Sequence, residues 1–324
     1  MKQTRILRYT FVAVLLLTAC HKDSGPEGTG YREAMRGFVI RISETARQQD
    51  PDFIVIPQNG VPLITLTDDD AGSSPATNYL AAIDGLGQED LFYGYDRDDV
   101  ATPAAERDWL LGFLHRGQQQ GKSILVTDYC HTPAHMADAY GRCDAEGFLS
   151  YPAPSRALDI IPANGIHHEN DLTIRYLSQA QNFLYLINPA NFSTKEAFIN
   201  AVRATNYDLL IMDLFLNGSQ MFTAEEVQRL RVKANGGQRI VLCYLSIGEA
   251  EDYRYYWQPS WEHRRPDWLE KENPDWPGNY KVRYWDPEWQ EIICGSADSY
   301  LNRILAAGFD GVYLDIIDAY EYFE

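Results

Sequence analysis

Short apolar runs alternate with helical patterns along almost the whole chain, and this alternation constrains the fold more than any other feature. Turn residues bound the runs, and some helical patterns begin at a capping residue, such as Thr223 with Glu226 in capping-box spacing. Such alternation is typical of parallel strands, because each helix returns the chain to the same edge of a sheet. We expect strands at 53–57, near 81–86, 123–127, 147–151, 183–187, 208–213, 240–245 and 311–316, and helices at 31–49, 103–120, 132–145, 170–180, 195–205, 223–234 and 287–307.

Eight strands that alternate with helices predict an α/β fold of the (β/α)8 TIM-barrel class. After residue 30, no linker and no shift in composition divides the chain. We therefore interpret residues 31–324 as a single domain, and we expect it to be a monomer.

The N-terminus has the pattern of an export signal. Three basic residues, Lys2, Arg5 and Arg8, precede an apolar run at 11–17, which is much shorter than the roughly 20 residues of a membrane-spanning helix. The sequence Leu-Thr-Ala-Cys at 17–20 resembles the lipobox of bacterial lipoproteins; the alternative is an ordinary signal with an incidental cysteine. We expect a signal peptide at 1–20 with lipidation at Cys20, a flexible tether at 21–30, and a membrane-anchored location in the periplasm or on the cell surface.

Charge and cysteine content limit the partners. The formal net charge is −18, which disfavours nucleic acid and anionic lipid and favours cationic ligands, although acidity also serves solubility. No CxxC or other zinc-like cysteine spacing is present, so we expect neither a metal nor a cofactor. Cys243 and Cys294 lie in apolar patterns and are expected to be buried thiols, whereas Cys130 and Cys143 either pair or stay free.

Carboxylates recur where the apolar runs end. In a TIM barrel these ends form the active-site face, and a buried acid is costly unless it is paired or used. Two carboxylates that face one cleft are what cleavage of a glycosidic bond requires. For any single acid, a helix cap or a salt bridge is the alternative. Polar residues at strand ends include Asn59, Glu89, Asp128, Asp213, Glu249, Asp315 and Asp318.

The segment 250–289 is long for a connection between a strand and a helix, and it holds six of the seven tryptophans. Long connections in compact domains are often functional, and aromatic faces, Trp257 among them, can stack on sugar rings. The alternative is a hydrophobic cluster that covers one end of the barrel.

Several long motifs resemble glycoside hydrolase family 114, the endo-α-1,4-polygalactosaminidase family of TIM barrels. They are YDLLIMDLF, VLCYLSIGEAEDYRYYW, YKVRYWDPEWQEII, GFDGVYLDIIDAYEYF, PDFIVIPQNG and IDGLGQEDLFYG. The resemblance covers nearly all of 31–324. Members of this family were formerly labelled as related to cysteinyl-tRNA synthetase, but this sequence has no HIGH-like or KMSKS-like motif.

The resemblance implies a catalytic pair of Asp315 and Glu89. Glu89 would be the general acid/base and Asp315 the nucleophile or stabiliser, or the two with exchanged roles. The implied substrate is a polysaccharide of galactosamine, whose free amines are cationic. The residues expected to bind it are Asn59, Asp128, Asp213, Tyr244, Glu249, Trp257 and Asp318.

The order of the motifs differs from that of the family. The family's barrel begins with the segment that matches 182–188, and its YLDIID strand precedes PQNG and GQED, whereas here PQNG comes first. This order implies a circular permutation with both termini in one loop after a strand, and a joining stretch at 159–171. It predicts that strand 311–316 pairs with strand 53–57, and that the tether leaves near Tyr31 on the active-site side. The alternative is two half-chains in a different fold.

Two other functions remain open. His131 and His135 fit the H-[ST]-x-x-H pattern of metal-dependent polysaccharide deacetylases, with Asp128 just before them and the acidic run 68–70 as a candidate upstream motif. Surface histidines near a helix start are the alternative explanation. A non-catalytic glycan-binding lipoprotein is the third reading, although the presence of both Glu89 and Asp315 argues against loss of the chemistry.

Overall fold

The computed structural model describes residues 25–26, 28, 30–67 and 71–324. The predicted signal peptide with Cys20, part of the tether and the acidic run 68–70 lie outside these residues. Within the described part of the chain, no helix combines the length and the apolar character that a membrane crossing requires.

Parallel strands form the centre of the described residues, in two sheets. The larger sheet has the order β1 (Ile54–Pro57), β13 (Gly311–Asp315), β9 (Ile240–Ser246), β6 (Leu209–Met212) and β5 (Phe183–Leu186). The smaller sheet has the order β2 (Gly85–Glu89), β3 (Ser123–Tyr129) and β4 (Leu149–Ala153). All these strands pair in parallel, which confirms the predicted α/β class with parallel strands.

The two sheets adjoin at both edges. β1 lies beside β2, where Gln58 and Gly87 form a parallel bridge, and β4 contacts β5. The first and last parallel strands also pair, with Ile54 opposite Gly311 and Pro57 opposite Leu314. The predicted pairing of 311–316 with 53–57 is therefore confirmed.

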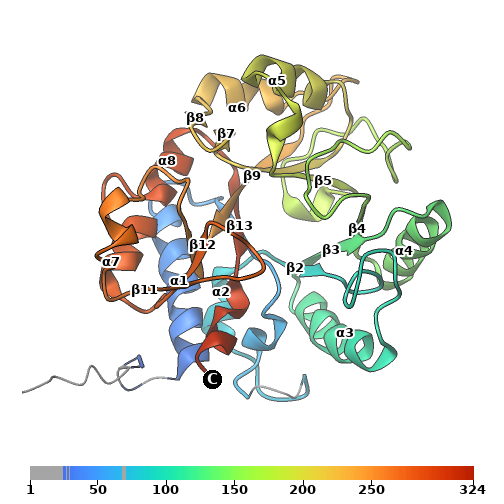
Figure 1. Ribbon diagram of the computed structural model, residues 1–324. Coiled ribbons are helices and arrows are strands. Elements are labelled where there is room, and N and C mark those ends of the chain that lie inside the picture. The colour runs from blue at the N-terminus through green and yellow to red at the C-terminus, as the bar shows by residue number, and fades with distance from the viewer. Residues whose placement is uncertain (1–24, 27, 29, 68–70) are drawn as a thin grey trace, which may run out of the picture.

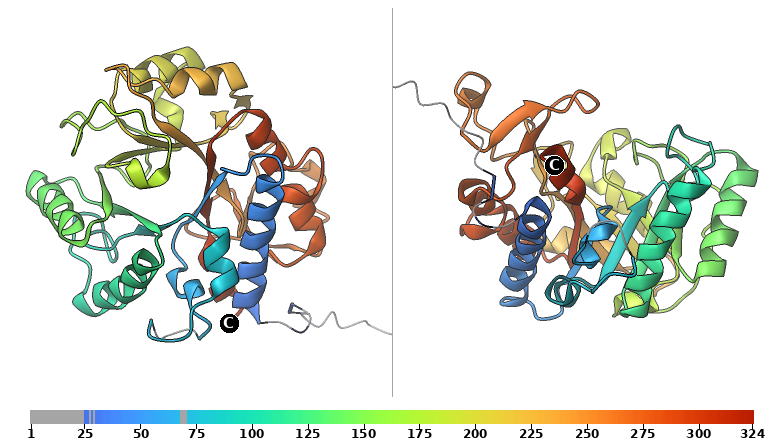
Figure 2. Two further views of the ribbon diagram at one scale, coloured as in Figure 1. Left: turned by 180° about the vertical axis from the view of Figure 1, so that it is seen from behind. Right: turned by 90° about the horizontal axis from the view of Figure 1, so that it is seen from below.

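Helices surround the strands (Figures 1 and 2). They cover the apolar strands with amphipathic faces: in α1, for example, Met35, Phe38, Val39 and Ile42 are buried at helical spacing. The capping box of Thr223 and Glu226 is confirmed at the start of α6. The helices are α1 (Tyr31–Arg47), α2 (Thr77–Ala82), α3 (Ala104–Gln119), α4 (Pro133–Glu146), α5 (Lys195–Arg203), α6 (Ala224–Leu230), α7 (Pro287–Gln290) and α8 (Tyr300–Ala306).

Three of the predicted elements are wrong in part. The run near 81–86 is the end of helix α2 followed by β2, which begins only at Gly85. The predicted helix at 287–307 is divided into α7, a π-helical turn at Glu291–Gly295 and α8, because Ser299 caps a new helix by accepting a hydrogen bond from Asn302 N.

The predicted helix at 170–180 is also wrong, since only Leu177–Gln179 form a 3-10 turn there. Side chains take the backbone amides that a helix would use. The Asn170 side chain accepts from Leu172 N, and the Gln179 side chain accepts from Arg175 N and Tyr176 N. Local side-chain bonds thus outcompete the helix.

The aromatic segment after β9 folds into a small antiparallel sheet with the order β10 (Glu249–Glu251), β12 (Asn279–Val282) and β11 (Leu269–Glu272). Its tryptophans pack edge to face, with ring centroids 5.3 Å apart for Trp257 and Trp261 and 5.1 Å apart for Trp261 and Trp268. Most of the segment is therefore a hydrophobic cluster, which was the alternative to a set of sugar-binding aromatic side chains. A two-stranded ribbon, β7 (Phe215–Leu216) and β8 (Gln220–Met221), completes the strands.

The four cysteines that the structure describes, Cys130, Cys143, Cys243 and Cys294, are all buried free thiols. Of the two alternatives for Cys130 and Cys143, the structure has the unpaired one. The burial expected for Cys243 and Cys294 is confirmed.

Candidate active site

A cavity of about 570 Å³ opens where the parallel strands end. Part of its lining comes from residues at or just after the last residue of a parallel strand, such as Asn59 after β1, Glu89 at the end of β2 and Asp315 at the end of β13. This volume lies within the usual range for ligand pockets, and the C-terminal ends of parallel strands are the usual place for a site in such folds.

One amide joins the two acids at the centre of the cavity. Gln58 Nε2 donates to Glu89 Oε2 at 3.0 Å and to Asp315 Oδ1 at 2.9 Å. Gln58 is buried and follows β1, which lies between the strands that carry the two acids. Because one nitrogen reaches both, the two accepting oxygens are at most about 6 Å apart.

Each acid has further donors of its own. Asn59 Nδ2 donates to Glu89 Oε2 at 3.0 Å, and the Tyr129 hydroxyl donates to Glu89 Oε1. The Tyr244 hydroxyl donates to Asp315 Oδ2 at 2.6 Å. These bonds fix the rotamers of both carboxyl groups without placing a cation on either one.

Burial dominates the electrostatics of this pair. The pKa of Asp315 is about 7, raised by burial and then by the nearby charge of Glu89, against the hydrogen bond from Tyr244. Burial likewise raises the pKa of Glu89, against the hydrogen bond from Tyr129. The pKa of Asp318 rises to about 7 through burial and the charge of Asp315. A carboxyl group that keeps its proton near neutral pH can act as a general acid.

The backbone directly after Asp315 is strained. Ile316 has φ 57°, in the left-handed region that a β-branched residue rarely adopts. Ile316 lines the cavity, and Asp315 O accepts a hydrogen bond from Ile247 N at 3.1 Å. Strain of this kind gathers at functional sites, where the surrounding structure holds it in place.

A buried ion-pair network forms one wall. Arg254 Nη1 lies 2.7 Å from Asp213 Oδ2, and Arg254 Nε pairs with Glu251 Oε2 at 2.5 Å. Beside it, Glu249 Oε1 accepts from Asn273 Nδ2 and from the Tyr322 hydroxyl, both at 2.8 Å. The positive charge of Arg254 is thus already balanced by its own neighbours.

Arg156 also lines the cavity. Its guanidinium lies 3.8 Å from the centroid of the Tyr129 ring and pairs with Asp90 at 3.0 Å and with Asp98 at 2.6 Å. Both arginines of the lining are therefore compensated by acids. The lining also holds four acids outside these ion pairs, which are Glu89, Glu249, Asp315 and Asp318.

The structure brings most of the sequence-predicted residues together. Those that line the cavity are Asn59, Glu89, Asp213, Tyr244, Glu249, Asp315 and Asp318.

Asp128 and Trp257 are the exceptions. Asp128 is fully buried and accepts hydrogen bonds from the backbone N–H groups of Phe92 and Tyr93, at 2.7 and 3.0 Å. Strand residues alternate in direction, so the next residue, Tyr129, reaches the cavity instead. Trp257 packs on Tyr280, with ring centroids 4.8 Å apart, and on Trp261, and so belongs to the aromatic cluster.

Sequence reasoning missed other lining residues. Gln58 precedes the predicted site residue Asn59, and Tyr129 follows the predicted site residue Asp128. The alternation of side-chain direction along β3 was the signal that could have identified Tyr129 in place of Asp128. Trp276, whose side chain is 54% exposed, lines the cavity in place of Trp257. Arg156 and Arg254 lie in irregular segments, where no periodicity predicts the direction of a side chain.

The histidine pair of the deacetylase alternative lies elsewhere. His135 Nδ1 is 3.1 Å from Asp99 Oδ1, and His131 N donates to the same oxygen at 3.0 Å. Neither histidine lines the cavity, and Asp128 is occupied by backbone donors. The three residues therefore do not form a common site.

Comparison with known proteins finds a family match in the C-terminal part of the chain. Residues 177–324 match the model of glycoside hydrolase family GH114. Three proteins that are described only as uncharacterized are similar to the chain. That of Deinococcus radiodurans is 47% identical over 123 residues, 38% of this chain and 37% of the relative. That of Methanocaldococcus jannaschii is 40% identical over 162 residues, which are 49% of this chain and 43% of the relative.

The third, from Thermotoga maritima, is 40% identical over 123 residues, 37% of this chain and 36% of the relative. The chain thus spans about two fifths of the length of the curated relatives it matches. The matched segment supplies Asp213, Tyr244, Glu249, Asp315 and Asp318 to the cavity, so residues 177–324 belong to glycoside hydrolase family GH114.

Proposed function

We propose that this protein hydrolyses glycosidic bonds with Glu89 and Asp315 as its two carboxyl groups. The observation that carries the proposal is the pair itself: two partly buried acids, held by one amide, in an acidic cavity of a chain whose residues 177–324 match GH114. Burying two like charges together is unfavourable, and catalysis is the best reason to retain them.

The spacing of the pair favours retention of the anomeric configuration. Retaining enzymes hold their carboxyl groups about 5–5.5 Å apart, whereas inverting enzymes leave about 6.5–9.5 Å for a water. An upper limit of about 6 Å between the two bridged oxygens fits the first class.

In the proposed reaction, an oxygen of Asp315 bonds to the anomeric carbon while the bond to the leaving oxygen breaks. Glu89 gives its proton to that oxygen. Water then attacks the same carbon, Glu89 takes one proton of the water, and the carboxylate of Asp315 is released. If the two acids exchange roles, the same bonds form and break and the same protons are transferred.

We propose a cationic amino-sugar polymer, with α-1,4-linked galactosamine as the first candidate, as the substrate. The uncompensated acids of the lining and the net charge of −18 support a ligand with free amines. Trp276, exposed at the rim, offers a face on which a sugar ring can stack.

We also propose that residues 31–324 form a single domain in which the parallel strands close into one barrel, as a circularly permuted version of the family. The adjoining edges of the two sheets support closure. The permutation is supported by the pairing of β1 with β13, by the helix-free connection 154–176, and by a family match that begins only at residue 177.

We propose, from residues 1–20 alone, that the chain is exported and anchored through Cys20. A tether on the active-site side is supported by neighbours of Tyr31: its ring lies 5.6 Å from that of Phe323, and the adjacent Tyr322 bonds to Glu249 of the cavity. Cys20→Ala should move the protein from the membrane fraction to the soluble fraction, whereas retention in the membrane would contradict the anchor.

The test is a screen of polymers. Wild type, Glu89→Gln and Asp315→Asn are incubated with deacetylated and acetylated polymers of galactosamine and glucosamine, and released oligosaccharides are measured by mass spectrometry. We expect cleavage of at least the deacetylated galactosamine polymer by wild type and by the control Asp108→Asn, an exposed acid. Unchanged turnover in both cavity variants would exclude hydrolysis by this pair. Binding without release by wild type would favour a non-catalytic glycan-binding protein.

A further inference from the structure

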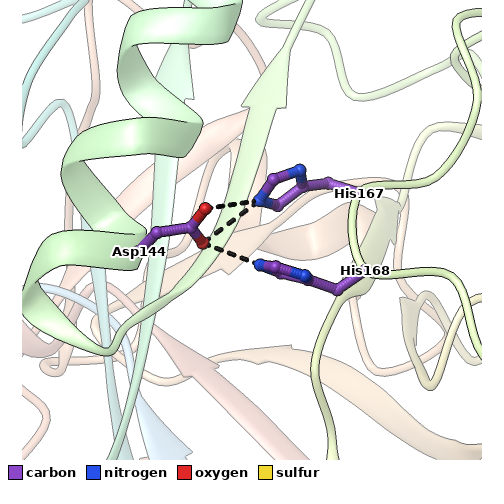
Figure 3. Close-up of side chains that lie close together, drawn as sticks. All are labelled: Asp144, His167 and His168. Carbon is purple, nitrogen blue, oxygen red and sulfur yellow. Dashed lines mark hydrogen bonds and ion pairs between the residues drawn. The ribbon is translucent and has the colours of Figure 1, made fainter.

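Two consecutive histidines converge on one aspartate at the edge of the sheet opposite the cavity. Asp144 lies in the last turn of α4, just before β4 begins, and His167 and His168 lie in the connection between β4 and β5 (Figure 3). His167 Nε2 is 2.9 Å from Asp144 Oδ2, and His168 Nε2 is 2.9 Å from Asp144 Oδ1. Within the described residues, these side chains form the one group of three or more whose metal-ligand atoms all lie within 4.8 Å of one another.

The backbone conformation at His167 and His168 directs both imidazole rings to the same side. Consecutive side chains in an extended segment point apart, but His168 has φ 53°, in the left-handed region. As a result, the ring centroids of His167 and His168 are only 4.0 Å apart. A non-glycine residue in this region is uncommon and indicates a constraint on the site.

Neighbouring side chains hold the conformation. The carbonyl oxygen of His168 accepts hydrogen bonds from Asn170 Nδ2 at 3.1 Å and from Asn182 Nδ2 at 3.0 Å. Asn182 is buried directly before β5, so the pair is attached to the sheet itself. The ring of His167 stacks on Tyr140, one turn before Asp144 in α4, with centroids 4.2 Å apart. The three donors are thus fixed relative to each other.

The separations of the donor atoms are close to those of a coordination sphere. Zinc binds imidazole nitrogen at about 2.0–2.1 Å and carboxylate oxygen at about 2.0–2.2 Å, so the donors around a tetrahedral ion lie about 3.3 Å apart. Here each imidazole nitrogen lies 2.9 to 3.1 Å from a carboxylate oxygen, and the ligand atoms of all three residues lie within 4.8 Å of one another. Two imidazoles and one carboxylate favour a divalent transition metal over Mg²⁺ or Ca²⁺.

A single histidine–carboxylate pair near the same helix end provides the comparison. His115 Nε2 lies 2.6 Å from Glu146 Oε2, with no second ring on the carboxylate. One imidazole is enough for an ordinary hydrogen bond. A second imidazole, brought in by an uncommon backbone conformation, is what a metal site needs.

We propose that Asp144, His167 and His168 bind one Zn²⁺-like divalent cation, with water in the open position. The ion would join the connection between β4 and β5 to helix α4. None of the three residues lines the cavity, so the site is structural and does not depend on the proposed function.

The test uses the full chain without a histidine tag, stripped with a chelator and then titrated with Zn²⁺ alone in a calorimeter. We expect one ion per chain with a Kd of about 1 μM or tighter, and a rise in Tm on addition of Zn²⁺. With Co²⁺, absorption bands of a tetrahedral complex should appear.

Matched variants locate the site. His167→Gln with His168→Gln should weaken binding at least about 100-fold and abolish the Tm response, and Asp144→Asn should weaken it at least about tenfold. His115→Gln should bind as wild type does. If the double variant unfolds, His167→Gln alone, checked by circular dichroism, makes the same test. Absence of binding by wild type at 100 μM Zn²⁺, or equal binding by wild type and the folded variants, would overturn the proposal.

Discussion

Two groups of ionisable side chains lie at opposite ends of the parallel strands, and they differ in how their charges are stabilised. Just before β6, Asp208 and Lys233 are both fully buried, 2.8 Å apart, and the aspartate also accepts from Asn170 Nδ2 and Gln181 N. At the other end, Glu89 and Asp315 are partly buried with amide and hydroxyl donors but with no cation in contact. The first group is complementary in charge, and the second is not.

The first group suits a role in stability, and the second suits a role in catalysis. A paired charge that is well bonded is costly to disrupt, because its partner would be left buried and alone. Two unpaired acids weaken the fold, yet their raised pKa values suit them to proton transfer.

The largest effect should come from removing either carboxyl charge in the cavity. Glu89→Gln and Asp315→Asn should each lower kcat on the galactosamine polymer by about 10⁴-fold, about 5.5 kcal/mol, because each removes a group that acts only in the reaction. The free energy of unfolding, measured with urea, should stay the same or rise. A large loss of stability in both variants would show that the pair is structural.

Lys233→Met should give the opposite result. It leaves Asp208 buried without its cation and should lower the free energy of unfolding by about 3–5 kcal/mol. The kcat of the folded variant should stay near that of wild type, because Lys233 is absent from the cavity lining. Urea denaturation, with activity measured per folded molecule, checks both statements, and a small change in stability would contradict the contrast.

The stability of wild type should depend on pH through the cavity acids. The pKa of Asp315 is about 7 in the folded protein, against an ordinary value of 3.8, so between these values the folded state holds a proton that the unfolded chain has lost. The free energy of unfolding should therefore fall as pH rises from about 4 to 7. In Asp315→Asn this fall should be shallower, although Asp318, with a pKa of about 7, still contributes. An equal slope in wild type and variant would contradict the assignment.

The smallest effect concerns a single hydrogen bond. Tyr244→Phe removes the donor to Asp315 Oδ2 and should lower kcat by about tenfold, about 1.4 kcal/mol. Since that bond lowers the pKa of Asp315, its loss should move the corresponding limb of the pH–rate profile upward. Tyr313→Phe is the matched control, because the buried hydroxyl of Tyr313 has no hydrogen-bond partner among the described residues. Equal profiles for the two variants would exclude a role for Tyr244.

Much of the fold follows from local pattern, and the failures have physical causes. Apolar runs such as 240–245 predict strands well, because a parallel strand covered on both faces must be apolar throughout. The helix expected at 170–180 fails because Asn170 and Gln179 bind backbone amides, a competition that no periodicity reveals.

The candidate site was predicted in outline for a similar reason. Acids at strand ends are brought together by any parallel sheet, so Glu89 and Asp315 meet although 226 positions separate them in the sequence. The prediction for Asp128 is wrong because side chains alternate along a strand and the adjacent Tyr129 faces the cavity instead. The prediction for Trp257 is wrong because tertiary packing, which the sequence pattern does not reveal, sets the path of a long connection. The bridging role of Gln58 depends on β1 lying next to β13, a long-range contact.

The central claim is that Glu89 and Asp315 are a closely spaced catalytic pair. The most direct measurement follows the first reducing ends released from an α-linked galactosamine polymer by proton NMR, before mutarotation. We expect α-anomers from wild type, and release reduced by about 10⁴-fold in Glu89→Gln and Asp315→Asn. β-Anomers, or undiminished release by either variant, would contradict it.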